Sequence, residues 1–283
     1  MSKINKLGLG ILVFDDICHL RNICVEIRDL CDEIVLCLQA ESYHGEPINP
    51  KVVDVCNRLK KEGVVDDIVF FEAVDKHEDG GPDGPRLIET DKRNFLIQYL
   101  ADKGCSHAQI IDSDEFYDHD DYARAKQHVD ENEAIKVSYC EYVNYYRDYT
   151  HVMVWPFRCY VPFIAEVGYR FNFRQGSFDK PSDPTRRYHI PEEGGQFCIF
   201  DFRTIKMHHL SWIRTNIEDK INAWSSKLHF LDYEELKRRC IDRYENYKNG
   251  QNAIIMFNVP YYNVAVNKLS YQYINPKYPM EVI

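Results

Sequence analysis

The amino-acid sequence predicts an α/β protein whose first half is a largely parallel sheet with helices on both faces. Between residues 7 and 112, short apolar runs of strand length alternate with longer segments in which apolar residues recur at helical spacing. Gly63 and Gly104 close two of these longer segments, as glycine commonly does at helix ends. Strands that alternate with helices in this way form a parallel sheet, because each helix returns the chain to the edge where the next strand begins.

Each element of this half has its own signal. The chain opens on the apolar strand LGLGILVFDD (7–16), and the next segment (17–33) places Leu20, Cys24 and Ile27 on one side of a helix. The remaining elements expected are, in order, a strand at 33–39 (EIVLCLQ), a helix at 49–63, a strand at 66–72 (DDIVFFE), a helix at 90–104 and a strand at 108–112 (AQIID).

The pattern changes after residue 130, where the strands become mixed or antiparallel and fold against the first sheet. The elements expected there are, in order, a strand at 134–143 (AIKVSYCEYV), strand candidates within 152–164 and 195–210, and two helices at 216–231 and 233–250. We therefore expect one domain over residues 1–250 and an irregular, aromatic C-terminal extension over 251–283.

The composition excludes several classes of protein. No run of about 18 apolar residues is present, so no membrane-spanning helix is expected, and the N-terminus lacks the cleavage site of a signal peptide. The ten cysteines include no C-x-x-C pair, which argues against a zinc site and favours a reducing, cytoplasmic location. The net charge of −10 disfavours a general affinity for nucleic acid.

The stretch QIIDSDEFY (109–117) ends an apolar strand in three carboxylates within four residues. Residues i and i+2 of a strand point to the same side, so Asp112 and Asp114 are expected to converge on one point, with Ser113 turned away. Such oxygen ligands suit Mg²⁺ or Mn²⁺. The alternative is an acidic turn that caps the next helix, with Asp118 or Asp120 as the N-cap residue.

Other segments accompany IIDSDE in a recognisable order. They are VEIRDLCDEIV (25–35), Glu41 with Ser42, the pair Glu89 and Arg93 in ETDKRN, and MHHLSWIR (207–214) followed by a helix that carries lysine. An α/β half whose fourth strand ends in D-x-D resembles the GT-A glycosyltransferases. The layout is most similar to the family-17 glycosyltransferases, which include β-1,4-N-acetylglucosaminyltransferases.

This resemblance implies a metal-dependent, inverting glycosyltransferase that takes a sugar from a nucleotide-diphosphate sugar, with a UDP-sugar as the preferred donor. It implies that residues 1–130 bind the donor, that residues 131–250 bind the acceptor, and that Mn²⁺ or Mg²⁺ holds the diphosphate. The metal ligands implied are Asp112, Asp114 and His209, with its neighbour His208 as an alternative. The donor-binding residues expected are Asp15, Asp16, Gln39, Glu41, Glu89, Lys92, Arg93, Asp112, Ser113 and Asp114. Lys92 and Arg93 are expected to open a helix, where anions are favoured.

The acceptor side carries weaker signals. A base must take the proton of the acceptor hydroxyl, and the candidates are Glu193, Glu192 and Glu166. Aromatic side chains stack on sugars, and a basic segment at 170–187 suggests an anionic ligand. The acceptor-binding residues expected are Tyr145, Tyr146, Trp155, Arg186 and Arg187. The acceptor itself stays open between a glycan and DNA with hydroxymethylated bases.

Two other functions fit the same pattern. A nucleotidyltransferase also presents carboxylates to a metal and a phosphate, but it usually has a glycine-rich loop after strand one, and FDDICHLRN (14–22) has none. A glycosyltransferase-like binding module that has lost catalysis is the second alternative. The loop DKHEDGGPDGPR (75–86) is either a lid over the donor or a surface insertion.

Overall fold

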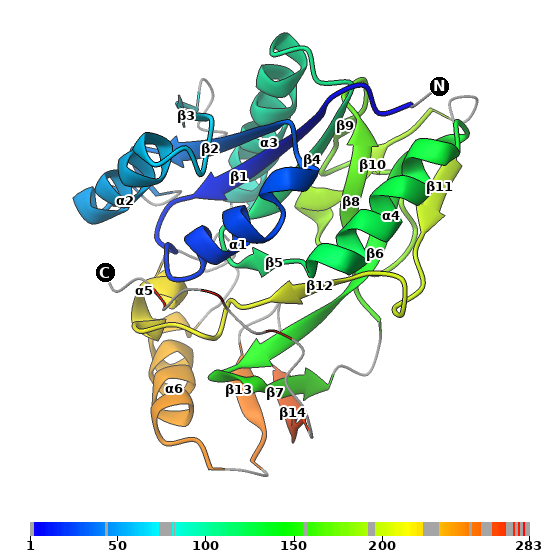
Figure 1. Cartoon of the computed structure of the whole chain (residues 1–283). Helices are drawn as coiled ribbons and strands as arrows, with labels where there is room; N and C mark the ends of the chain where they lie inside the picture. Colours follow the sequence, from blue (N-terminus) through cyan, green and yellow to red (C-terminus); the bar gives the residue numbers. More distant parts are fainter. Residues whose placement is uncertain are drawn as a thin grey trace.

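The computed structural model describes residues 3–42, 45–73, 81, 83–154, 158–191, 196–222, 232–248, 251–255, 262–269, 274, 277 and 280. These residues form a large curved sheet with helices on both faces (Figure 1). The α/β class expected from the sequence is confirmed.

The first half of the chain is the parallel part of the sheet. Its strands are β1 (Leu7–Val13), β2 (Glu33–Gln39), β3 (Asp67–Phe71) and β4 (His107–Asp112). They pair in the order β4-β1-β2-β3, and every pairing is parallel. The helices are α1 (Leu20–Glu26), α2 (Pro50–Lys61), α3 (Gly84–Asp102) and α4 (His119–Glu131). Side chains of α1, α2 and α4 share one hydrophobic core, whereas α3 packs in the core of the other face.

The second half adds mixed strands, as expected. Its strands are β5 (Glu115–Phe116), β6 (Ile135–Tyr146), β7 (Asp148–Val154), β8 (Tyr160–Glu166), β9 (Arg170–Phe171), β10 (Tyr188–His189), β11 (Gln196–Ile199) and β12 (Lys206–His209). The long strand β6 is central: it pairs antiparallel with β7 and β8 and parallel with β11 and β12. Because β8 also pairs with β4, the two halves share one sheet.

The expectation of an irregular C-terminal extension is wrong for part of it. Strand β13 (Ala253–Ile255) pairs with β14 (Tyr262–Lys268), which pairs in turn with β7. Helices α5 (Ile217–Asn222) and α6 (Tyr233–Glu245) pack with these strands around a third core. The signal in the sequence was the alternation of apolar and polar residues in YNVAVNK (262–268), which is typical of a strand. This strand pairs with the edge of β7 that β6 leaves open.

Helix α3 begins six residues before the expected start at residue 90. Pro85 lies in its first turn, where proline is well tolerated, and the helix therefore extends back into the segment expected as a loop. Lys92 and Arg93 consequently lie inside the helix, and both are buried. The expectation that they open the helix is wrong.

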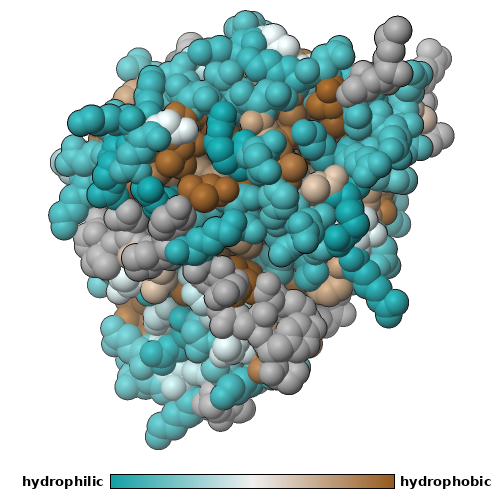
Figure 2. Space-filling model, viewed as in Figure 1, coloured by the Kyte–Doolittle hydropathy of each residue, from teal (hydrophilic) through white to brown (hydrophobic). Residues whose placement is uncertain are grey.

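All ten cysteines are free, and the hydrophobic residues lie mostly in the interior. On the face seen in Figure 2, hydrophilic residues predominate and hydrophobic ones form separate patches. Within the described residues, none of the helices combines the length and apolar character that crossing a membrane requires.

Glycine in β1 allows α3 to lie directly on the sheet. A Cβ atom on Gly10 would lie 2.4 Å from Leu96 Cδ2, which is closer than side chains tolerate. We expect Gly10→Ala to lower the free energy of unfolding by about 1–3 kcal/mol through overpacking. Gly168→Ala is the matched control, since its Cβ would meet nothing within 4 Å. Urea unfolding of both variants measures the difference, and equal stabilities would contradict this packing.

His107, the first residue of β4, gives the fold a pH dependence. Burial, aided by Lys3, lowers the pKa of His107 from 6.5 to about 4. The unfolded chain therefore binds more protons than the folded chain between these values, so stability falls as pH drops from 6.5 to 4. We expect His107→Gln to lose this component, about 3 kcal/mol in all. Urea unfolding at pH 7.5 and 4.5 tests it: the wild-type protein should lose more stability than the variant.

Candidate functional site

The parallel strands bring two acidic segments to one edge of the sheet. β1 and β4 are neighbours in register, with Leu12 beside Asp112, so the residues that follow both strands lie together. Asp15 and Asp16 follow β1, while Asp114 follows β4 in a tight turn. Ligands of parallel sheets bind at this edge.

The short strand β5 adds a row of polar residues next to this edge. Glu115 in β5 pairs with His209 in β12, and His209 pairs with Asn144 in β6. Residues in register across neighbouring strands point to the same face, so these three side chains are neighbours. His208 points to the other face, where it is buried and its Nδ1 lies 2.8 Å from the Tyr145 hydroxyl.

Asp114, Glu115 and His209 form a group with the composition of a metal site. One ligand atom from each lies within 4.8 Å of the others. His209 Nδ1 lies 2.5 Å from Asn144 Oδ1, and since this oxygen can only accept, Nδ1 carries the hydrogen. The other ring nitrogen, Nε2, lies 3.5 Å from Asp114 Oδ1.

The fit of a cation rests on Asp114 Oδ1, which lies beside Nε2 of His209. Asp114 Oδ1 is buried and accepts no hydrogen bond within the described part of the chain. A buried carboxylate oxygen that accepts no hydrogen bond is unfavourable unless a positive charge lies beside it. The donor set of two carboxylates and one imidazole is one that Mn²⁺ accepts.

Asp112 has different partners and lies outside this group. Arg186 contacts both Asp112 and Glu115, and Arg93 lies 3.0 Å from Asp112 and 2.7 Å from Glu89. Burial opposes ionisation of Asp112, but Arg186 and Arg93 outweigh it and lower its pKa to about 2. Asp112 is not in the group formed by Asp114, Glu115 and His209: the strand ends at Asp112, and the chain turns before Asp114.

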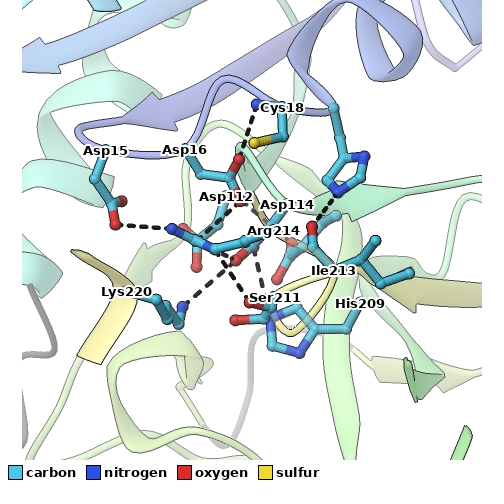
Figure 3. Close-up of polar contacts among 12 residues, drawn as sticks. Asp15, Asp16, Cys18, Asp112, Asp114, His209, Ser211, Ile213, Arg214 and Lys220 are labelled. Atoms are coloured by element: carbon cyan, nitrogen blue, oxygen red, sulfur yellow. Dashed lines mark hydrogen bonds and ion pairs between the residues drawn. The ribbon is translucent and has the colours of Figure 1, made fainter. Parts of the chain in front are cut away.

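Arg214 joins the two acidic segments (Figure 3). Its guanidinium lies 2.8 Å from Asp15, 2.9 Å from Asp16 and 3.2 Å from Asp114 Oδ2. Lys220 of α5 approaches the same Asp114 oxygen at 3.4 Å. Burial would raise the pKa of Asp114, but Lys220, His209 and Arg214 outweigh it and hold the pKa well below its ordinary value. Asp114 is therefore ionised at neutral pH.

The ion pairs join six carboxylates to four lysine and arginine side chains, so the carboxylates outnumber these basic partners. The carboxylates are Asp15, Asp16, Glu89, Asp112, Asp114 and Glu115, and the basic residues are Arg93, Arg186, Arg214 and Lys220. Burial raises the pKa of Asp16 and of Glu115, against the effect of their arginine partners.

The other residues expected to bind the donor lie around this cluster. Gln39 ends β2 and is buried, whereas Glu41 is exposed and follows it. Ser113 is buried in the turn between Asp112 and Asp114. Lys92 is 2 % exposed, and burial lowers its pKa.

The expected acceptor residues are mostly not available to an acceptor. Tyr145 and Tyr146 are fully buried, and Tyr146 packs in the third core. Arg187 contacts Ser182, with Nε 3.1 Å from the hydroxyl. Arg186 lies in the carboxylate cluster. Part of the positive charge of the segment 170–187 is therefore paired within the protein and is not available to a ligand.

Of the candidate bases, Glu166 is far from the site. It pairs with His107 at the start of β4, whereas Asp112 ends that strand, about 16 Å away. Glu166 contacts Lys136 and Lys3 instead. Glu192, Glu193, Trp155 and most of the 75–86 loop lie outside the described residues.

Sequence reasoning did not select Glu115, Asn144, Arg214 or Lys220. Glu115 was visible in IIDSDE and Arg214 in MHHLSWIR, but neither had a partner that sequence spacing could reveal. The capping alternative is settled by Asp118, whose side chain accepts from the backbone of Asp120 and Asp121 at the start of α4. Asp114 takes no part in that cap.

Arg186 and Arg187 offer a direct test of the ion-pair cluster. We expect Arg186→Met to lower the free energy of unfolding by about 3 kcal/mol, because Glu115 and Asp112 lose their shared partner in a buried site. Arg187→Met removes only contacts with neutral groups of Ser182 and should cost about 1 kcal/mol or less. Denaturant unfolding of the two variants measures this, and similar losses would show that the cluster does not depend on Arg186.

Comparison with known proteins gives distant structural similarities. Neither a protein-family model nor a curated protein sequence matches the chain. Two solved structures of S. aureus TarS match. The first, of residues 1–349, has a TM-score of 0.40 at 11% identity and covers 77% of this chain and 63% of that one. The second has a TM-score of 0.38 at 8% identity and covers 86% of this chain and 44% of that one. The chain thus spans less than two thirds of either. Glucosyl-3-phosphoglycerate synthase from Mycobacterium tuberculosis, in complex with Mn²⁺, UDP and glucosyl-3-phosphoglycerate, matches with a TM-score of 0.38 at 11% identity, over 94% of this chain and 88% of that one.

Proposed function

We propose that this chain is a metal-dependent glycosyltransferase that transfers a sugar from a nucleotide-diphosphate sugar to an acceptor hydroxyl. The observation that carries the proposal is the arrangement at Asp114, where one oxygen lies 3.5 Å from His209 Nε2 and the other faces Arg214 and Lys220. A cation site beside two basic side chains suits a diphosphate, because a metal ion and positively charged side chains can share its negative charge.

The metal would be held by Asp114, Glu115 and His209. When bound, it would neutralise charge on the diphosphate as a Lewis acid. Asn144 holds the imidazole of His209 through Nδ1, which leaves Nε2 beside Asp114 as the nitrogen that would ligate the metal. Arg186 forms an ion pair with Glu115, so the carboxylate is oriented before any ligand binds.

Basic residues of this chain would assist the departure of the nucleotide. In the transfer, the acceptor oxygen forms a bond to the anomeric carbon, and the bond from that carbon to the diphosphate oxygen breaks. The electron pair stays on the diphosphate, whose new charge Arg214 and Lys220 are placed to stabilise. The acceptor proton goes to a base, for which Glu192 and Glu193 remain predictions.

Donor recognition would fall to the edge between β1 and β4. Asp15 is partly exposed and Asp16 is buried beside it, while Arg93 is held inside α3 between Glu89 and Asp112. UDP is our first choice of nucleotide, because the similarity to the family-17 glycosyltransferases implies it. A glycan is a better candidate for the acceptor than DNA. Arg186 of the basic segment is buried and paired, so it is not available to bind DNA phosphates.

The test of this function uses Asp114→Asn, which keeps the size of the side chain and removes its charge. If metal and carboxylate together stabilise the departing diphosphate by about 3 to 4 kcal/mol, turnover should fall roughly 10²- to 10³-fold. Mn²⁺ affinity, measured by calorimetry, should fall in the same variant. His209→Ala should raise the Mn²⁺ concentration required and reduce turnover less.

Asp118→Asn is the matched control, since the same substitution there preserves a helix cap. Its turnover and melting temperature should stay close to wild type. Release of UDP from a UDP-sugar in the presence of Mn²⁺ serves as the assay before the acceptor is identified. A folded wild-type protein that binds UDP and Mn²⁺ but never releases UDP from a UDP-sugar would favour the binding module. An active Asp114→Asn variant would contradict the metal site.

A further inference from the structure

The turn that carries Arg214 is attached to the first half of the chain by His19. His19 is the residue before α1 and is 1 % exposed. Its Nε2 lies 2.8 Å from the backbone oxygen of Ile213, the residue next to Arg214. A carbonyl oxygen only accepts, so Nε2 carries the hydrogen and donates it.

The contact at the other ring nitrogen, Nδ1, agrees with a hydrogen on Nε2. His19 Nδ1 lies 3.3 Å from the Tyr149 hydroxyl, which donates to it, and the two rings meet edge to face at 6.0 Å. An imidazole that carries its hydrogen on Nε2 therefore satisfies both contacts. It links three segments, namely the start of α1, the Arg214 turn and strand β7.

The contact between His19 and Ile213 is important because the next residue, Arg214, bridges the two acidic segments. The guanidinium must reach Asp15 and Asp16 on one side and Asp114 on the other, at distances of 2.8 to 3.2 Å. From the second half of the chain, Tyr244 contacts the same turn through the Trp212 carbonyl at 2.9 Å. Figure 3 shows Ile213 directly beside the Arg214 cluster. Residue 212 is thus held from one half of the chain and residue 213 from the other.

We propose that His19 is a positioning residue that sets the Arg214 guanidinium between the two acidic segments. Without it, the Ile213 carbonyl loses a buried donor and the turn can rotate. A displacement of about 1 Å in a positioning group is enough to disturb a site of this kind. For its effect on a nucleotide diphosphate, this inference rests on the proposed function.

The first test needs no ligand. Arg214 Nε lies 3.1 Å from the Ser211 carbonyl, so its N–H is held in a hydrogen bond and should give a resolved ¹H–¹⁵N signal. The signal is assigned by its loss in Arg214→Lys. We expect it to shift or broaden in His19→Leu, which has no donor, and to return in His19→Gln, whose amide can donate to Ile213.

The second test measures UDP binding by calorimetry with Mn²⁺ present. We expect His19→Leu to weaken UDP about tenfold, His19→Gln to restore it to within about threefold, and Mn²⁺ affinity to stay within about twofold. In an Arg214→Gln background, His19→Leu should have no further effect on UDP, because the residue it positions is gone. A merely structural role would leave the effect of His19→Leu the same in both backgrounds.

The outcomes separate this inference from the proposed function. A wild-type protein that does not bind UDP contradicts the function, whereas the Arg214 signal still tests His19. An unchanged Arg214 signal in folded His19→Leu overturns the inference. If His19→Leu does not fold, Tyr149→Phe replaces it, since it removes only the hydroxyl that orients the ring; a smaller change in the Arg214 signal is then expected, and no change overturns the inference.

Discussion

The rest of the structure depends on one electrostatic constraint, the placement of several carboxylates at a single buried edge of the sheet. Asp16, Asp114 and Glu115 are at most 3 % exposed, so water cannot neutralise them. Each must meet a positive charge within the protein, because an isolated buried carboxylate is too unfavourable to remain ionised. The strands create this constraint themselves, since the register of β1 and β4 brings both acidic segments together.

The positive charges come from distant parts of the chain. Arg93 lies in α3, Arg186 in the short helix at 184–186, Arg214 in a turn and Lys220 in α5. Three of these four segments belong to the second half of the chain, so docking of that half also completes the site. The site is therefore complete only when both halves are folded, and a change in the second half acts directly on the acids of the first.

This origin explains what the sequence could predict. Apolar runs and helical spacing report local burial, and they identified the parallel half and the mixed half correctly. The start of α3 could not be predicted correctly because the segment 75–86 is rich in Gly, Pro and Asp, as loops are. Pro85, which is also common in the first turn of a helix, is hidden within that composition. Glu115, Asn144 and Arg214 could not be selected, because their roles arise from pairing between β5, β12 and β6 and from contacts across about a hundred residues of chain. Spacing reports neighbours along the chain and says nothing of such partners.

The two aspartates of D-S-D show the same limit most clearly. Spacing groups them, whereas their partners separate them: Asp112 is held by two arginines, and Asp114 lies beside Arg214, Lys220 and His209. Each oxygen of Asp112 meets an arginine, whereas Oδ1 of Asp114 accepts no hydrogen bond within the described residues. Asn144 and Arg186 already fix His209 and Glu115 around that oxygen. The cation that we propose would therefore meet ligands held in place beforehand, so its binding free energy would not be spent on ordering side chains.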